Sequence, residues 1–149
     1  MIKLELLIPP KPLKRARHAS RGKFISTYYT AKDKQEMDTL ESAIINALTQ
    51  ENKDYINEML KTAHKGLEIH LSLMFGFAFP QSYSKKKKDA LLHHGHTLAP
   101  DLDNLTKNVL DRGNGILWSD DKLITYIWAN KVWSEYNYIK IEIYYESTQ

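Results

Sequence analysis

Alternation of apolar and polar residues marks four stretches of the chain as β-strands. They are IKLELLI at residues 2–8, LEIHLSLMFGFAF at 67–79, KLITYIWANKVW at 122–133 and YNYIKIEIYYE at 136–146. The second has an apolar residue at every other position along its whole length, which predicts the central strand of a sheet. Pro9 and Pro10 end the first strand, because proline has no N–H with which to extend a ladder.

Spacings of three and four residues between apolar positions predict helices between these strands. Thr30 followed by Asp33 is a cap signal, and apolar residues then recur at helical spacing, so we expect a helix from 31 to about 50. Asn52 starts a second helical pattern, which Gly66 would close as a C-cap. A mobile lid and an insertion are the alternatives for this second segment.

Two segments of the chain are rich in cations. KPLKRARHASRGK at 11–23 carries six cations and no acid, and we expect a basic loop that runs to Phe24. KKKK at 85–88 belongs to a predicted short helix with Ser82 or Ser84 near its start and Gly95 after its end. Such segments repel themselves unless they are solvated or paired with an anion, and two of them together favour a polyphosphate partner.

The order of strands and helices has no regular βαβ repeat, which favours the α+β class with a mixed sheet of about four strands. A chain of 149 residues fits one domain, 1–149, with a core of its own. It contains no cysteine, which excludes disulfides and thiolate metal sites. No run of roughly 18 apolar residues is present, so we expect no membrane partner and a cytoplasmic protein.

The stretch PDLDNLTKNVLDRGNGILWSDD gathers acids at two points, Asp101 with Asp103 and Asp120 with Asp121, in a chain of formal charge +3. A helix should begin within a residue or two of Asp101, since Pro100 disfavours helix before it. Asp103, Lys107 and Asp111 are four residues apart and would share one helix face, with the lysine between two carboxylates. By itself, Asp101 is most simply explained as an N-cap residue.

The second acidic point precedes a predicted strand. If Asp120 and Asp121 are both extended, their side chains point to opposite faces, so one of the two could reach a site shared with Asp101 and Asp103. The alternative is an Asp-rich turn. Carboxylates about 5 Å apart repel by roughly 3 kcal/mol at an effective dielectric of about 20, so a shared site requires a proton, a lysine or a divalent cation. Oxygen ligands without cysteine favour Mg²⁺ or Mn²⁺, which implies metal-assisted phosphodiester hydrolysis with Lys107 orienting water or stabilising charge.

These residues resemble the signature of the RusA family of Holliday junction resolvases, small bacterial and prophage endonucleases. The family pattern is an Asp-x-Asp-Asn-x-x-Lys run, a downstream Asp, a turn, and an Asp-Asp pair that enters a strand, and PDLDNLTKNVLD…NGILWSDDKLI matches it. The resemblance implies a homodimeric, Mg²⁺-dependent enzyme that nicks opposed strands of a four-way DNA junction, with no small-molecule cofactor. The chain departs from the pattern in an extra segment, 53–65, and in Arg112-Gly113 after the helix.

The resemblance also implies roles for individual residues. The metal-binding acids would be Asp101, Asp103 and Asp121, with Lys107 as the catalytic lysine. Asn104, Asp111 and Asp120 would be supporting residues. The DNA contacts would come from the two basic segments, and the candidates are Lys14, Arg15, Arg17, Arg21, Lys85 and Lys86.

Other readings of the sequence stay open at this point. A zinc site at His93, His94 and His96 is disfavoured, because adjacent histidines at a helix end cannot easily face one ion. Trp118, Trp128 and Trp133 are interpreted as core or dimer interface, with stacking on unpaired bases as the alternative. The competing functions are a nuclease that also cuts flaps and forks, and a DNA-binding accessory protein without catalytic activity.

Overall fold

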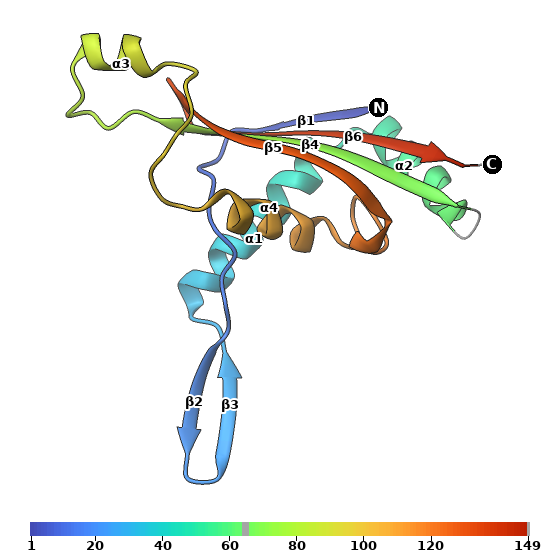
Figure 1. Ribbon diagram of the computed structural model, residues 1–149. Helices are drawn as coiled ribbons and strands as arrows, with labels where there is room; N and C mark the ends of the chain where they lie inside the picture. The colour runs from blue at the N-terminus through green and yellow to red at the C-terminus, as the bar shows by residue number, and fades with distance from the viewer. Residues whose placement is uncertain (64–65, 149) are drawn as a thin grey trace.

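The four alternating segments form one mixed sheet in the computed structural model, which describes residues 1–63 and 66–148 (Figure 1). The strands are β1 (Ile2–Leu6), β4 (Leu67–Ala78), β5 (Ile124–Ser134) and β6 (Tyr138–Ser147), in the order β1-β6-β4-β5. β4 pairs antiparallel with β6 and parallel with β5. The predicted mixed sheet of the α+β class is therefore confirmed, and so is the interior position of the strand that begins at Leu67.

One face of the sheet carries the core. The inward residues of β6, Ile139, Ile141 and Ile143, are almost completely buried. Helices α1 (Ala31–Ala47) and α4 (Leu102–Gly113) lie against this face (Figure 1), and α2 (Gln50–Lys61) buries Ile56 in the same core. Trp118 and Trp133 are also buried, whereas Trp128 is 46% exposed. The core interpretation thus holds for two of the three tryptophans.

The helix starts follow their capping residues. Thr30 and Asp33 form a reciprocal capping box at the start of α1, as predicted. α2 begins at Gln50 because the Thr49 side chain caps it, two residues before the predicted start. The prediction that Gly66 caps α2 is wrong, since the helix ends at Lys61 with Thr62 as C-cap. The remainder of the predicted segment near Lys65 lies outside the described residues.

The short basic helix is α3 (Lys85–Leu91), and it starts at the cap Ser84, one of the two predicted positions. It ends earlier than expected, with Leu92 as C-cap and a left-handed His93 (φ 66°) before Gly95. The backbone N–H of His93 donates to Trp133 O, which joins the end of this segment to β5. α3 lies beyond one end of the sheet (Figure 1).

The basic loop predicted up to Phe24 is wrong in its second half. There the chain forms a hairpin of β2 (Arg17–Arg21) and β3 (Phe24–Tyr28), which projects away from the body of the protein (Figure 1). The two-residue turn contains Gly22 at φ 61°, a conformation that glycine adopts without strain. The hairpin has no buried face, so no hydrophobic alternation marked it in the sequence.

Within residues 1–63 and 66–148, no helix is long and apolar enough to cross a membrane.

Candidate active site

Helix α4 carries the first group of candidate residues. Asp101 is its N-cap, as predicted, but the Asp101 side chain makes no capping hydrogen bond. The preceding loop is held by Lys131 of β5, whose Nζ donates to Leu98 O and to Pro100 O at 2.8 Å. The carboxylate of Asp101 is therefore exposed and not engaged by the helix start that it precedes.

An open hollow beside α4 brings together residues that are distant in the sequence. Asp103, Lys107 and Asp111 line it from α4, and Asp121 lines it from the segment before β5. Asp101 does not line this hollow, although it begins the same helix. Of the three predicted metal-binding acids, the hollow thus places Asp103 and Asp121 together.

The two adjacent aspartates have different environments. Asp120 is extended, but Asp121 begins a 3₁₀ turn, η2 (Asp121–Leu123), so the two residues form the Asp-rich turn that was the alternative to a pair of extended residues. The Asp120 carboxylate accepts a hydrogen bond from the backbone N–H of Lys122 at 3.0 Å, and this bond chiefly lowers the pKa of Asp120. Asp120 is thus held by its own turn, while Asp121 borders the hollow.

A buried tryptophan fixes the turn that leads to Asp121. The Trp118 side chain packs against Gly113, the last residue of α4, and its Nε1 donates to Leu110 O at 3.3 Å. The Tyr145 hydroxyl of β6 donates to Leu117 O, and burial raises the pKa of Tyr145. Gly115 in this turn has a positive φ (80°), while Gly113 is helical.

The charges around the hollow are mostly free of protein partners. Asp103, Lys107 and Asp111 form no ion pair or side-chain hydrogen bond within the described residues. Lys107 lines the hollow with both carboxylates but pairs with neither in the described part of the chain. An unpaired lysine beside carboxylates at an open surface can interact with an anionic ligand.

The carboxylates that line the hollow are possible ligands of a metal ion. In the described part of the chain, no three or more His, Asp and Glu side chains are grouped closely enough to hold a metal ion. Mg²⁺, however, commonly uses one or two carboxylates and completes its shell with water and substrate phosphate oxygens. Asp103 and Asp121, which border one hollow, fit that requirement in donor chemistry.

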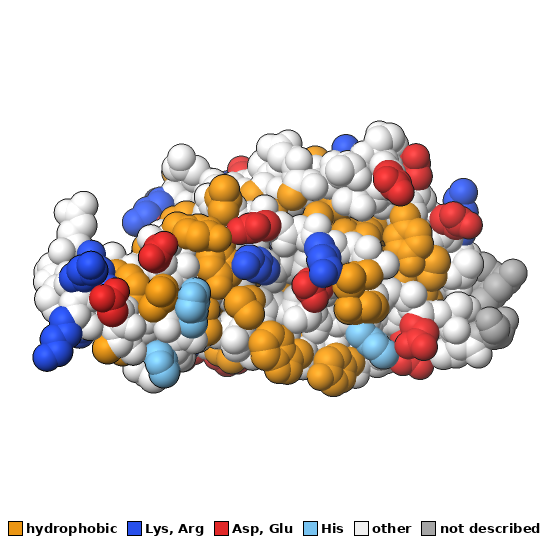
Figure 2. All heavy atoms as spheres, turned by 90° about the horizontal axis from the view of Figure 1, so that it is seen from above, with side chains coloured by type: hydrophobic (Ala, Val, Ile, Leu, Met, Phe, Trp, Pro, Cys, Tyr) orange, Lys and Arg blue, Asp and Glu red, His pale blue; other side chains and the backbone are white. Residues whose placement is uncertain are grey.

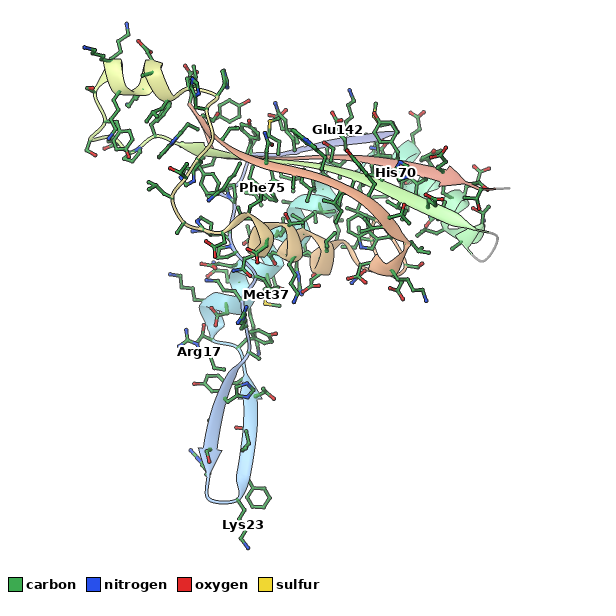
Figure 3. All side chains as sticks on the ribbon, in the orientation of Figure 1. Arg17, Lys23, Met37, His70, Phe75 and Glu142 are labelled. Atoms are coloured by element: carbon green, nitrogen blue, oxygen red, sulfur yellow. The ribbon has the colours of Figure 1, made fainter. Side chains whose placement is uncertain are left out.

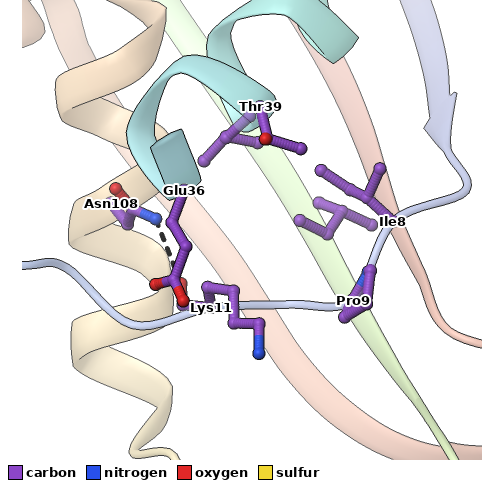
Figure 4. A pocket seen from close by; sticks show the side chains of 8 residues that line it. Ile8, Pro9, Lys11, Glu36, Thr39 and Asn108 are labelled. Atoms are coloured by element: carbon purple, nitrogen blue, oxygen red, sulfur yellow. Dashed lines mark hydrogen bonds between the residues drawn. The ribbon is translucent and has the colours of Figure 1, made fainter. Parts of the chain in front are cut away.

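The first basic segment is bound to α4 and α1. Leu13 N donates to Asn104 O at 3.2 Å, and Asn108 Nδ2 donates to Lys11 O at 3.1 Å (Figure 4). Lys14 Nζ lies 3.0 Å from Glu36 Oε2 of α1. The sequence did not predict these contacts, which place the cationic segment on the helix that carries Asp103 and Lys107.

The remaining candidates lie away from the hollow. Lys85 and Lys86 are exposed at the start of α3, beyond the end of the sheet. His96 is buried, and its ring stacks on Phe77 with the ring centroids 4.1 Å apart. The sequence analysis did not identify Lys131. Its only signal in the sequence was a single cation at a strand position where the alternation predicts an inward-facing side chain.

The protein is an α+β domain in which carboxylates and an unpaired lysine line an open hollow, and a cation-rich hairpin projects from the same domain. These features define a class of enzymes that act on nucleic acid phosphates. The family described as "Endodeoxyribonuclease RusA" matches residues 8–144, so the chain belongs to this family. No curated protein sequence matches the chain. The sequence-based assignment to the RusA family is confirmed. The protein is an endodeoxyribonuclease of a metal-dependent family whose function is to resolve Holliday junctions.

Proposed function

We propose that the protein cuts four-way DNA junctions by paired phosphodiester hydrolysis, with Mg²⁺ as the metal and Mn²⁺ as a substitute. Asp101, Asp103 and Asp121 would hold the metal. The observation that carries this proposal is the shared hollow of Asp103 and Asp121, which come from opposite ends of the signature. The free carboxylate of Asp101 at the start of the same helix supports its inclusion as a third ligand.

The residues around the hollow have separate roles in this proposal. When bound, the metal supplies a water of lowered pKa and polarises the phosphoryl oxygen. Lys107, which has no acidic partner among the described residues, stabilises negative charge that develops on the phosphate. Asp111 lies one turn further along α4 and lines the same hollow, so it supports the site without a direct bond to Lys107. Asp120 supports Asp121 by holding the turn through Lys122 N.

The basic residues bind the DNA backbone. Lys14, Arg15, Arg17 and Arg21 belong to the segment that Leu13 and Lys11 attach to α4, so phosphates bound there lie beside the hollow. Asn104 supports this arrangement by accepting the bond from Leu13 N. Lys85 and Lys86 lie at a different end of the protein and contact another arm of the branched substrate.

A homodimer supplies the second active site that paired cutting requires, and the outer face of the sheet is the surface that fits a second copy. Tyr126 and Tyr144 are paired in register with His70 on this face and are 57% and 46% exposed. Apolar groups gather here among lysines and glutamates (Figure 2). A surface with exposed rings and charges of both signs can be complementary to itself across a two-fold axis.

The direct test is cleavage of a synthetic four-way junction. With Mg²⁺, we expect symmetric nicks in two opposed strands, and the same strands annealed as linear duplexes serve as controls. A junction that stays intact in both Mg²⁺ and Mn²⁺ would overturn the catalytic proposal and favour a DNA-binding accessory protein. Equal cutting of flaps and forks would favour a nuclease of broader structural tolerance. From membership of the family, whose members are bacterial and prophage endonucleases, we also infer a bacterial or prophage origin and a site of action in the bacterial cytoplasm.

A further inference from the structure

The β2–β3 hairpin, residues 17–28, is an arm that projects from the body of the protein and contacts it at its base. Every residue of β3 is exposed, and Phe24 and Ile25 next to the turn are 81% and 76% exposed. Lys23 lies at the tip, far from the body of the protein, and Arg17 lies near the base (Figure 3). An isolated two-stranded hairpin is marginally stable in water, and exposed apolar groups commonly mark binding sites. The large exposed ring at the end of this hairpin therefore favours a role in binding.

The register of the arm separates its two faces. Residues directly opposite in an antiparallel pair lie on the same face. Arg17 is opposite Tyr28, and Arg21 is opposite Phe24, so one face presents two cations, each beside an aromatic ring. Ile25 is opposite Ser20 on the other face, which carries no arginine. The arm therefore has one cationic, aromatic face.

Contacts at the base fix the direction of the arm. Arg17 Nε lies 3.8 Å from Asp33 Oδ2 at the start of α1. The pKa of Asp33 is lowered, first by its hydrogen bond with the Thr30 side chain and also by Arg17 and Lys14, which keeps the carboxylate charged. Leu13 N bonds to Asn104 O of α4, so the arm extends from the helix that borders the hollow.

We propose that this arm enters the open centre of the DNA junction, where Phe24 stacks on a base pair at the branch point and Arg21 binds the adjacent phosphate. This inference rests on the proposed function and deepens it. The end of each duplex arm at a branch exposes the flat face of a base pair, which an aromatic ring can cover whatever the sequence. In a continuous duplex the same ring must first separate stacked pairs, at a cost of a few kcal/mol per step. Phe24 would thus favour branched over linear DNA.

The charge of the arm argues against a second protein copy as its partner. The arm, residues 17–28, contains three cations and no acid, so two arms brought together would repel. The phosphate backbone supplies the opposite charge, and apolar side chains inserted between base steps are an established means of kinking DNA. DNA is therefore the partner that fits both the charge and the ring.

The test uses a junction with 2-aminopurine next to the branch point, in EDTA so that cutting is prevented. Wild-type protein should lower the 2-aminopurine fluorescence, because the ring stacks on the exposed face of the base. Phe24→Ala should remove this decrease and weaken junction binding about tenfold, while binding to linear duplex changes less than about twofold. Phe24→Trp should restore the signal. Ile25→Ala is the matched control, since Ile25 is similarly exposed on the opposite face.

Three results would overturn the proposal: an unchanged fluorescence decrease with Phe24→Ala, an equal loss of the decrease with Ile25→Ala, or no decrease with wild-type protein. A change in the sedimentation of Phe24→Ala without DNA would also overturn it by assigning the ring to a contact between copies. Junction cleavage by the wild-type protein in Mg²⁺ is measured separately. Cleavage without a Phe24 effect rejects the arm inference alone, whereas fluorescence without cleavage rejects the catalytic proposal alone.

Discussion

The ring of Trp118 packs directly on Gly113, so closely that a Cβ built on this glycine would overlap the Trp118 Cζ2 atom. Trp118 is fully buried and cannot move aside freely. The contact joins the end of α4 to the turn that carries Asp121, and so it links the two halves of the acidic signature.

Gly113→Ala should destabilise the protein by about 1–3 kcal/mol, because the added methyl group overpacks the buried indole. Denaturant unfolding followed by Trp fluorescence measures this change. Gly95→Ala is the control, since Gly95 has a negative φ and a Cβ there meets no atom within 4 Å. Equal effects of the two substitutions would contradict the close approach.

Replacement of each proposed metal ligand should abolish cutting without abolishing binding. Asp101→Asn, Asp103→Asn and Asp121→Asn each remove a carboxylate and should lower the cleavage rate at least about a hundredfold, because the metal loses a ligand. Asp120→Asn should be milder, as this side chain is already bonded to Lys122 N. Gel-shift binding in EDTA is the accompanying measurement, and full cleavage by Asp103→Asn would reject the site.

Arg15→Ala combined with Arg17→Ala should weaken junction binding and reduce its dependence on salt. Each lost phosphate contact lowers the slope of log K against log salt by about 1. Titrations between low and moderate salt give the slope. Lys61→Ala in the last turn of α2 is the control for a general loss of charge. If the slope of the double variant equals that of the wild type, these arginines do not contact phosphate.

Trp128→Glu should convert the proposed dimer to a monomer. Trp128 is 46% exposed and is paired in register with Ser72 on the outer face of the sheet, where a buried carboxylate would oppose association. Sedimentation velocity at several concentrations reports the change, and paired nicking should become single nicking. A wild-type protein that remains monomeric at micromolar concentration would contradict the dimer.

The buried His96 should make stability fall as the pH decreases below about 6.5, the ordinary histidine pKa. Burial, followed by the nearby charge of Lys131, lowers the pKa of His96 in the folded protein. The unfolded chain therefore binds a proton that the folded chain does not, and stability is lost until the pH reaches the lowered pKa. His96→Phe keeps a ring against Phe77 and should reduce this loss, as measured by thermal unfolding at pH 7.5 and pH 5.5. An unchanged difference between the two pH values would rule out His96 as its source.

The sequence by itself determined the four strands of the sheet, the main helices and the residues of the acidic signature. Alternation in the segment from Leu67 predicted an interior strand, because its inward residues are buried from Leu67 to Phe75. A regular period of apolar residues arises where one face of an element is buried. The Thr30–Asp33 box predicted the start of α1 for an equally local reason.

The tertiary structure alone decided which acids meet and where the basic segment lies. The hairpin has no buried face and so left no pattern in the sequence. Asp121 reaches the hollow because the packing of Trp118 sets the turn before it, and the basic segment reaches α4 through backbone bonds of Leu13 and Lys11. Such contacts join residues far apart in the chain and use backbone groups that every residue carries, so no local pattern of side chains could specify them.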